Sequence, residues 1–128
     1  MYQAQSDELM FFNGHMAAVP LYEAFAGKLF ERFPDTSMRV QKTQITFSNR
    51  HVYACVSLAR VKRKNELPDP YLVVTLGLPY SLDSDRVAVK TEPYPGRWTT
   101  HIVVGTQTDF NDEFWDWVRQ AYEFAENK

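Results

Sequence analysis

The most apolar strand-like stretch of this chain is Tyr71-Leu72-Val73-Val74-Thr75-Leu76-Gly77-Leu78. Apolar side chains occupy both sets of alternating positions, as expected for a strand that is covered on both faces of its sheet. Pro79 follows directly, and a proline has no N–H group to donate to a neighbouring strand. We therefore predict a central strand over residues 71–78.

Other stretches around this strand alternate with a period of two. Residues 44–48 predict one strand, and residues 52–61 predict a longer one with Tyr53 on the face opposite Ala54. The predicted set is completed by strands from Met38 to Val40, over 86–92 and over 99–104, and by turns at Asn49-Arg50 and Pro93-Tyr94-Pro95-Gly96. The sheet should therefore have five or six strands.

Helices are predicted on both sides of the strand region. Ser6 is a candidate N-cap for a short N-terminal helix. Pro20 suits the first turn of a second helix, whose apolar residues recur every four positions until Pro34 stops it. Asn111 is the expected N-cap of a third helix that runs to Glu126.

The order of these elements, two helices, then the strands, then one helix, predicts the fold class. Strands that are segregated from helices along a chain form an antiparallel sheet, here with the two N-terminal helices and the C-terminal helix packed on one face. The expected class is α+β rather than a doubly wound fold. A length of 128 residues and a mass of 14.9 kDa fit one domain over residues 1–128.

Two segments carry a resemblance to a known family. One is Lys42-Thr43-Gln44-Ile45-Thr46-Phe47, followed by Val52-Tyr53-Ala54; the other is Thr100-His101-Ile102-Val103-Val104, followed by Asp112-Glu113, Trp117, Ala121, Tyr122 and Ala125. Together they resemble the bacterial family catalogued as domain of unknown function 5655, over about residues 20–126. The resemblance implies a small α+β domain, either alone or as the C-terminal module of a longer chain. It implies no activity and transfers no catalytic residues.

Charge is distributed unevenly along the chain, although the net charge is only −2. Residues 39–97 hold ten Lys and Arg against five Asp and Glu, a net charge of +5, whereas residues 1–38 and 98–128 carry −3 and −4. Acidic helices that cover and complement a basic sheet would produce this pattern, and so would a basic surface for an anionic ligand. Both interpretations stay open.

Most common metal sites and catalytic sites require residue patterns that this sequence lacks. The three histidines are not spaced to share a metal with one another or with the lone Cys55, so no metal and no cofactor are expected. Cys55 lies mid-strand without a neighbouring cation, and no nucleophile elbow or glycine-rich phosphate loop occurs. No catalytic residue is predicted, and an enzyme is the less favoured interpretation.

The remaining candidates form a polar and aromatic set. An arginine offers a planar fork of donors, and a tryptophan offers a stacking face, so such a set can line a pocket for an anionic or planar ligand. The predicted ligand-binding residues are Lys42, Tyr53, Tyr94, Arg97, Trp98 and His101. In the alternative interpretation, the aromatic rings cover the sheet edge, Arg97 pairs with an acid of the last helix, and His101 is a hydrogen-bonded structural residue.

These features favour a non-catalytic binding module for a small anionic molecule or a protein partner. Nucleic-acid binding through the basic sheet is a disfavoured alternative, and an enzyme with an unidentified site is another. A homodimer would explain a strand that is apolar on both faces. One cysteine, no secretory signal and no run of about 20 apolar residues point to a cytoplasmic chain without a membrane span.

Overall fold

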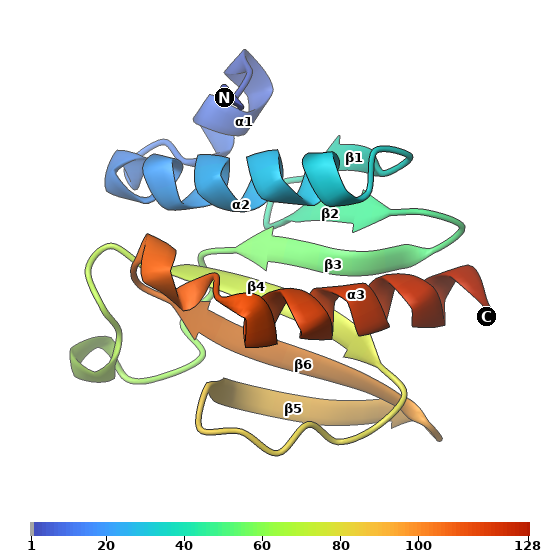
Figure 1. The fold of residues 1–128 in the computed structure, drawn as a ribbon. Coiled ribbons are helices and arrows are strands. Elements are labelled where there is room, and N and C mark those ends of the chain that lie inside the picture. Colours follow the sequence, from blue (N-terminus) through green and yellow to red (C-terminus); the bar gives the residue numbers. More distant parts are fainter. Residues whose placement is uncertain (1) are drawn as a thin grey trace.

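The structure, a computed structural model, describes residues 2–128, so Met1 lies outside it (Figure 1). Its helices are α1 (Ser6–Phe11), α2 (Val19–Arg32) and α3 (Asp112–Glu126), and its strands are β1 (Ser37–Val40), β2 (Ile45–Ser48), β3 (Val52–Ser57), β4 (Leu72–Leu78), β5 (Val87–Tyr94) and β6 (Arg97–Val104). Three 3-10 turns, η1 (Met16–Ala18), η2 (Lys64–Glu66) and η3 (Gln107–Asp109), lie between them. The predicted α+β class, with two N-terminal helices and one C-terminal helix, is confirmed.

All six strands belong to one antiparallel sheet with the order β1-β2-β3-β4-β6-β5. Strand β4 lies inside this sheet, where Val74 pairs with Val56 of β3 and with Ile102 of β6. The predicted central strand is therefore confirmed, although it begins at Leu72 rather than at Tyr71. The chain skips one position between β4 and β5, and β6 fills the gap.

Helices α2 and α3 lie side by side across one face of the sheet, and α1 packs beside α2 near β1 (Figure 1). The core between the layers is aromatic. Phe25 of α2 is fully buried, stacks on Trp115 of α3 with ring centroids 5.6 Å apart, and meets the ring of Phe47 from β2 edge to face. Trp117 is also buried and lies under the guanidinium of Arg86. The periodic stripes of both helices thus face the sheet, as amphipathic helices require.

Strand β3 differs from its prediction in two ways. It ends at Ser57, not at residue 61, because β4 begins at Leu72 and its last pair with β3 is Val73 opposite Ser57. In addition, the register with β2 shifts at Ser48, which inserts one extra residue into β3. The shift turns Tyr53 to the helix side, against Phe33 and Tyr122, so the prediction that it faces away from Ala54 is wrong.

The outer face of the sheet carries mostly short polar side chains. One cross-strand row runs Arg39, Thr46, Cys55, Thr75, His101, Val89 over all six strands. Val73 also points to this side by register, yet it is fully buried. A depression lined by residues 60–63 and Glu66 of the β3–β4 loop together with Ala88 of β5 shows that this loop lies next to β5.

Several predicted caps and turns are present with one correction. The N-cap of α1 is Gln5 rather than Ser6, because the carboxylate of Glu8 accepts the backbone N–H of Gln5 at 2.7 Å. Asn111 caps α3 as predicted, accepting the backbone N–H of Phe114 at 3.0 Å. The β2–β3 turn also caps α3, since the Asn49 amide donates to the carbonyl of Tyr122.

Candidate functional site

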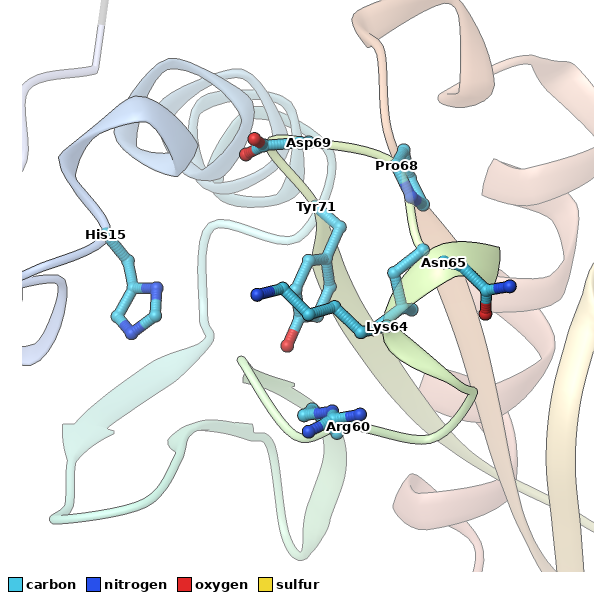
Figure 2. Close-up of a pocket in the computed structure, with 8 residues that line it drawn as sticks. His15, Arg60, Lys64, Asn65, Pro68, Asp69 and Tyr71 are labelled. Atoms are coloured by element: carbon cyan, nitrogen blue, oxygen red, sulfur yellow. The ribbon is translucent and has the colours of Figure 1, made fainter.

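Three loops meet at one end of the fold: the α1–α2 connection, the β1–β2 turn and the β3–β4 loop (Figure 1). Between the first and the third lies a cleft of about 840 Å³. Its lining consists of His15, Arg60, Lys64, Asn65, Leu67, Pro68, Asp69 and Tyr71 (Figure 2). Ligand pockets in proteins have volumes of roughly 300–1,000 Å³, so this cleft has the size of a binding site.

The β3–β4 loop is held in place by two contacts with the sheet. The hydroxyl of Tyr71 donates to the carbonyl of Leu58 at 2.5 Å, which closes the neck of the loop. Further along, Pro68 lies against Gly105 at the end of β6; a Cβ atom at position 105 would be 2.7 Å from the Pro68 ring. The close approach therefore requires a glycine at 105. The peptide bond between Asp69 and Pro70 is cis.

Two cations, Arg60 and Lys64, and the imidazole of His15 line the cleft. Arg60 and Lys64 come from the β3–β4 loop and His15 from the α1–α2 connection, and all three are exposed to solvent. Within residues 2–128, none of the three lies in ion-pair distance of a carboxylate, although Asp69 shares the lining. Figure 2 shows their side chains around the same space as the ring of Tyr71. The cleft thus offers free positive charge to an anion.

Two smaller depressions adjoin the cleft and share His15 with it. One of them runs towards the β1–β2 turn and is lined by Phe11, Asn13, His15, Lys42, Thr43, Leu58 and Ala59. It brings Lys42 to the same end of the molecule as Arg60 and Lys64. The site is therefore a cleft with a lateral groove, and both parts carry cationic side chains.

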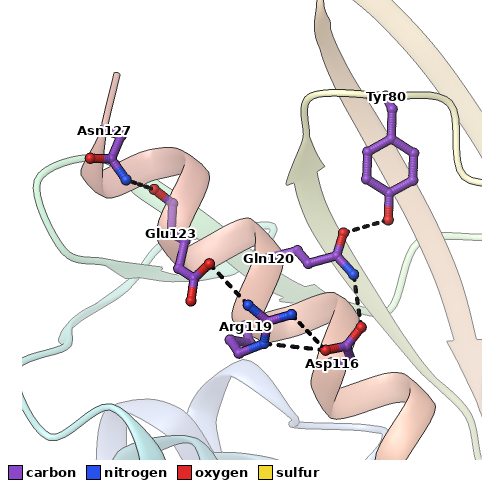
Figure 3. A network of polar contacts seen from close by, with 6 residues as sticks. All are labelled: Tyr80, Asp116, Arg119, Gln120, Glu123 and Asn127. Carbon is purple, nitrogen blue, oxygen red and sulfur yellow. Dashed lines mark hydrogen bonds and ion pairs between the residues drawn. The ribbon is translucent and has the colours of Figure 1, made fainter.

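Two acidic residues of α3, Asp116 and Glu123, share one basic partner, Arg119 (Figure 3). Arg119 contacts Asp116 at 2.7 Å and Glu123 at 2.9 Å. Gln120 bridges Asp116 and the hydroxyl of Tyr80. The bond from Arg119 holds the pKa of the Asp116 carboxyl below its usual range. These acids lie on the exposed side of α3, so they leave the charge of the cleft uncompensated.

The residues predicted for a ligand site are not brought together. Lys42 lies in the groove beside the cleft. Tyr53 is 1% exposed and its hydroxyl bonds Thr36 at 2.7 Å, which places it in the core under the helices. Burial raises the pKa of this phenol well above its usual range. Trp98 of β6 is half-buried and pairs with Leu78 of β4.

The other three predicted residues lie on the β5–β6 hairpin. Tyr94, 66% exposed, pairs with Arg97 across the two-residue Pro95-Gly96 turn. Arg97 is eight residues from Gly105 along β6, so about 25 Å of strand separate the hairpin tip from the cleft. His101 lies mid-strand on the outer face, where its Nδ1 is 2.8 Å from Thr75 Oγ1. Partial burial lowers the pKa of its imidazole.

Sequence reasoning missed most of the cleft. The cations of the β3–β4 loop entered it only as part of the basic region 39–97, and no pattern joined this loop to His15, 45 residues before Arg60. Tyr71 was assigned to the central strand. The signal that was available is the density of cations in residues 60–64, where four of five residues are Lys or Arg.

Other kinds of site receive no support from the described residues. No group of three His, Cys, Asp or Glu side chains within residues 2–128 is placed to hold a metal ion. Cys55 is half-buried on the outer face, and burial raises the pKa of its thiol to about 11, which disfavours the reactive thiolate. No helix in residues 2–128 has the length and apolarity to cross a membrane.

Comparison with known proteins agrees with the resemblance carried by the two sequence segments. Neither the curated proteins nor the solved structures gave a match. The model of one protein family, described as "Domain of unknown function (DUF5655)", matches residues 10–125. The match covers α2, the whole sheet, α3 as far as Ala125 and the three loops that meet at the cleft end of the fold. The chain therefore belongs to the DUF5655 family.

Proposed function

We propose that this protein is a binding module for a small anionic ligand, and that the cleft between the α1–α2 connection and the β3–β4 loop is its binding site. The observation that carries the proposal is the convergence of Arg60, Lys64 and His15 on one cleft without a carboxylate in ion-pair distance. Unpaired cations that share a concave surface attract and orient an anion.

The individual groups suit this role in different ways. A guanidinium binds a carboxylate or phosphate through two parallel hydrogen bonds, whereas an ammonium acts as a compact charge with three donors. Arg60 and Lys64 offer one of each. Asn65, on the same loop, adds an amide that can donate to the anion or accept from a hydroxyl group. His15 adds an imidazole ring whose nitrogens can donate or accept a hydrogen bond.

The proposal is tested by titrating the ¹⁵N-labelled full chain at constant ionic strength with inorganic phosphate, acetate, succinate and adenosine monophosphate. We expect amide shifts concentrated in residues 13–16 and 58–71. The variants Arg60→Gln and Lys64→Gln should each weaken binding about tenfold, because one charge-assisted hydrogen bond contributes roughly 1.5–3 kcal/mol.

Lys62→Gln provides a matched control. Lys62 belongs to the same loop and has the same charge, but it lines the depression on the other side of the loop. Its replacement should change the affinity less than twofold. Equal losses in all three variants would mean that the anion senses only the general charge of the loop, and an absence of shifts at the cleft with every anion would refute the proposal.

A further inference from the structure

The cleft has an apolar wall beside its cationic rim of Arg60 and Lys64. Leu67, Pro68 and Tyr71 form this wall, and the first and last of them are half-buried. The hydroxyl of Tyr71 is already committed to the carbonyl of Leu58, so the residue presents its ring rather than a donor. Pro68 is fixed against Gly105. The wall is therefore held in shape by the loop that also carries Arg60 and Lys64.

Apolar surface continues from the cleft into its neighbours. The lateral groove contains Phe11, Leu58 and Ala59 beside Lys42. Met16, which lines the other adjoining depression, is 52% exposed. Exposed apolar side chains next to a concave site are typical of surfaces that bind a ligand or a partner. The cleft and its lateral groove thus both combine cations with apolar side chains.

The volume of the site also exceeds what a bare anion can fill. One water molecule occupies about 30 Å³ in the liquid, and a carboxylate or phosphate group is only a few times larger. A cleft of about 840 Å³ would keep most of its water around such an ion. Water against Leu67, Pro68 and the Tyr71 ring is released only when the ligand carries apolar groups of its own.

From this arrangement we infer that the ligand is an amphiphilic anion, with a carboxylate or phosphate head bound by Arg60 and Lys64 and an apolar body lying on Leu67, Pro68 and Tyr71. The inference rests on the proposed function and narrows its ligand class. The head is recognised by charge, and the body by the area it removes from water.

The test is the chain-length dependence of binding. The full-length protein is titrated with acetate, butanoate, hexanoate and octanoate below their micelle concentrations and at constant ionic strength. We expect the affinity to rise about two- to fourfold for each added methylene, with the lower value for groups that stay partly in water. Octyl phosphate and octanoate, compared at equal chain length, identify the preferred head group.

Two variants separate the wall from the rim. Leu67→Ser should flatten the chain-length dependence and leave the affinity for acetate unchanged, whereas Arg60→Gln should weaken every member of the series by a similar factor. Val89→Ser is the control, because Val89 is an exposed valine on β5 outside the cleft lining; it should alter neither quantity.

The possible outcomes are distinguishable. Anions that bind at the cleft with no gain from added methylenes would overturn this inference and leave the proposed function standing. A chain-length dependence that survives in Leu67→Ser would also overturn it, since the apolar contact would then lie elsewhere. If no anion of either head type shifts the cleft residues, both the inference and the proposed function fail.

Discussion

Among the charged residues of positions 2–128, Glu8 is the one that is buried. It is fully buried, and its carboxylate accepts the hydroxyl groups of Tyr2 and Tyr22 as well as the backbone N–H of Gln5. Burial, and then the bond to this carboxylate, raise the pKa of both phenols well above the usual range. Three donors on one buried acceptor group fix the N-terminal segment to α2.

Replacing Glu8 by Gln should therefore be costly. A Gln amide has one acceptor oxygen instead of two, so at least one buried donor loses its partner, which costs about 1–3 kcal/mol. Urea unfolding of Glu8→Gln should show a loss of this size. Glu31→Gln makes the same chemical change at an exposed position of α2 and should change stability by less than about 0.5 kcal/mol. Equal unfolding midpoints for the two variants would contradict this account of Glu8.

His101 predicts a specific dependence of stability on pH. Its pKa is lowered by burial, so the folded chain holds the imidazole neutral where the unfolded chain, with a pKa of about 6.5, begins to bind a proton. The free energy of unfolding contributed by this group is complete above about pH 6.5 and is lost as the pH falls through that value and the lower folded pKa.

The direct measurement is an NMR titration of the three histidine rings. We expect His101 to titrate below the ordinary histidine range. Thr75→Val removes the hydroxyl beside Nδ1 but keeps the burial; the pKa should stay low in this variant, because burial is the cause of the shift. A normal pKa for His101 in the native protein would disprove the assignment.

At the scale of elements, the contact between the β3–β4 loop and the end of β6 connects fold and site. A Cβ atom at position 105 would overlap the Pro68 ring, whereas a Cβ at Gly77, inside β4, would meet no atom within 4 Å. Pro68 is exposed and belongs to a loop, so the loop rather than the sheet should move. The same movement would displace the apolar wall of the cleft.

Gly105→Ala should therefore weaken ligand binding and lower stability by about 1–2 kcal/mol, within the range for overpacked sites. Gly77→Ala, the matched change in a strand, should be neutral or slightly stabilising. Urea unfolding and the octanoate titration measure the two effects. If Gly105→Ala behaves like Gly77→Ala in both, Pro68 does not hold the loop.

Most of the helices and strands were predictable, because the local sequence patterns agree with the way these elements pack in the fold. A strand that is apolar on both faces became an inner strand, and helix stripes ending at Pro34 or beginning at Asn111 face the core. The early end of β3 was not predictable, because it depends on where its partner β4 begins. The face of the sheet to which Tyr53 points was not predictable either, because one inserted residue in a strand reverses which of its alternating side chains face the core.

At the scale of the whole molecule, topology assembles the candidate site. His15, Lys42 and Arg60 come from three separate loops, and only the folded arrangement places them at one end. The predicted aromatic set at the β5–β6 turn was close in sequence, but the length of β6 separates it from the cleft. Its role in ligand binding remains a prediction. The homodimer also remains a prediction. One of the apolar side chains that suggested it, Val73, is already buried within a single chain.

The charge distribution of the molecule predicts how binding of a polyanion depends on salt. Arg60 and Lys64 line the cleft and Lys42 lines the groove beside it, while Asp116 and Glu123 lie on the exposed side of α3. A twelve-nucleotide single strand should bind only at low salt. Contacts from about three cations should give a slope near −2 for log affinity against log salt. Fluorescence anisotropy measures this slope. A much steeper slope, reduced by both Lys62→Gln and Arg63→Gln, would identify the loop as a nucleic-acid surface.

The positions of the three tryptophans have a practical consequence for finding the ligand. Trp115 and Trp117 are buried between the helices and the sheet, Trp98 lies on β6, and none of them lines the cleft. Their emission should change strongly when the chain unfolds, because the rings become hydrated. It should change little when the cleft is filled. A ligand search that monitors intrinsic fluorescence at constant temperature would therefore overlook a true ligand, whereas the same emission followed during heating would detect it through the raised melting temperature.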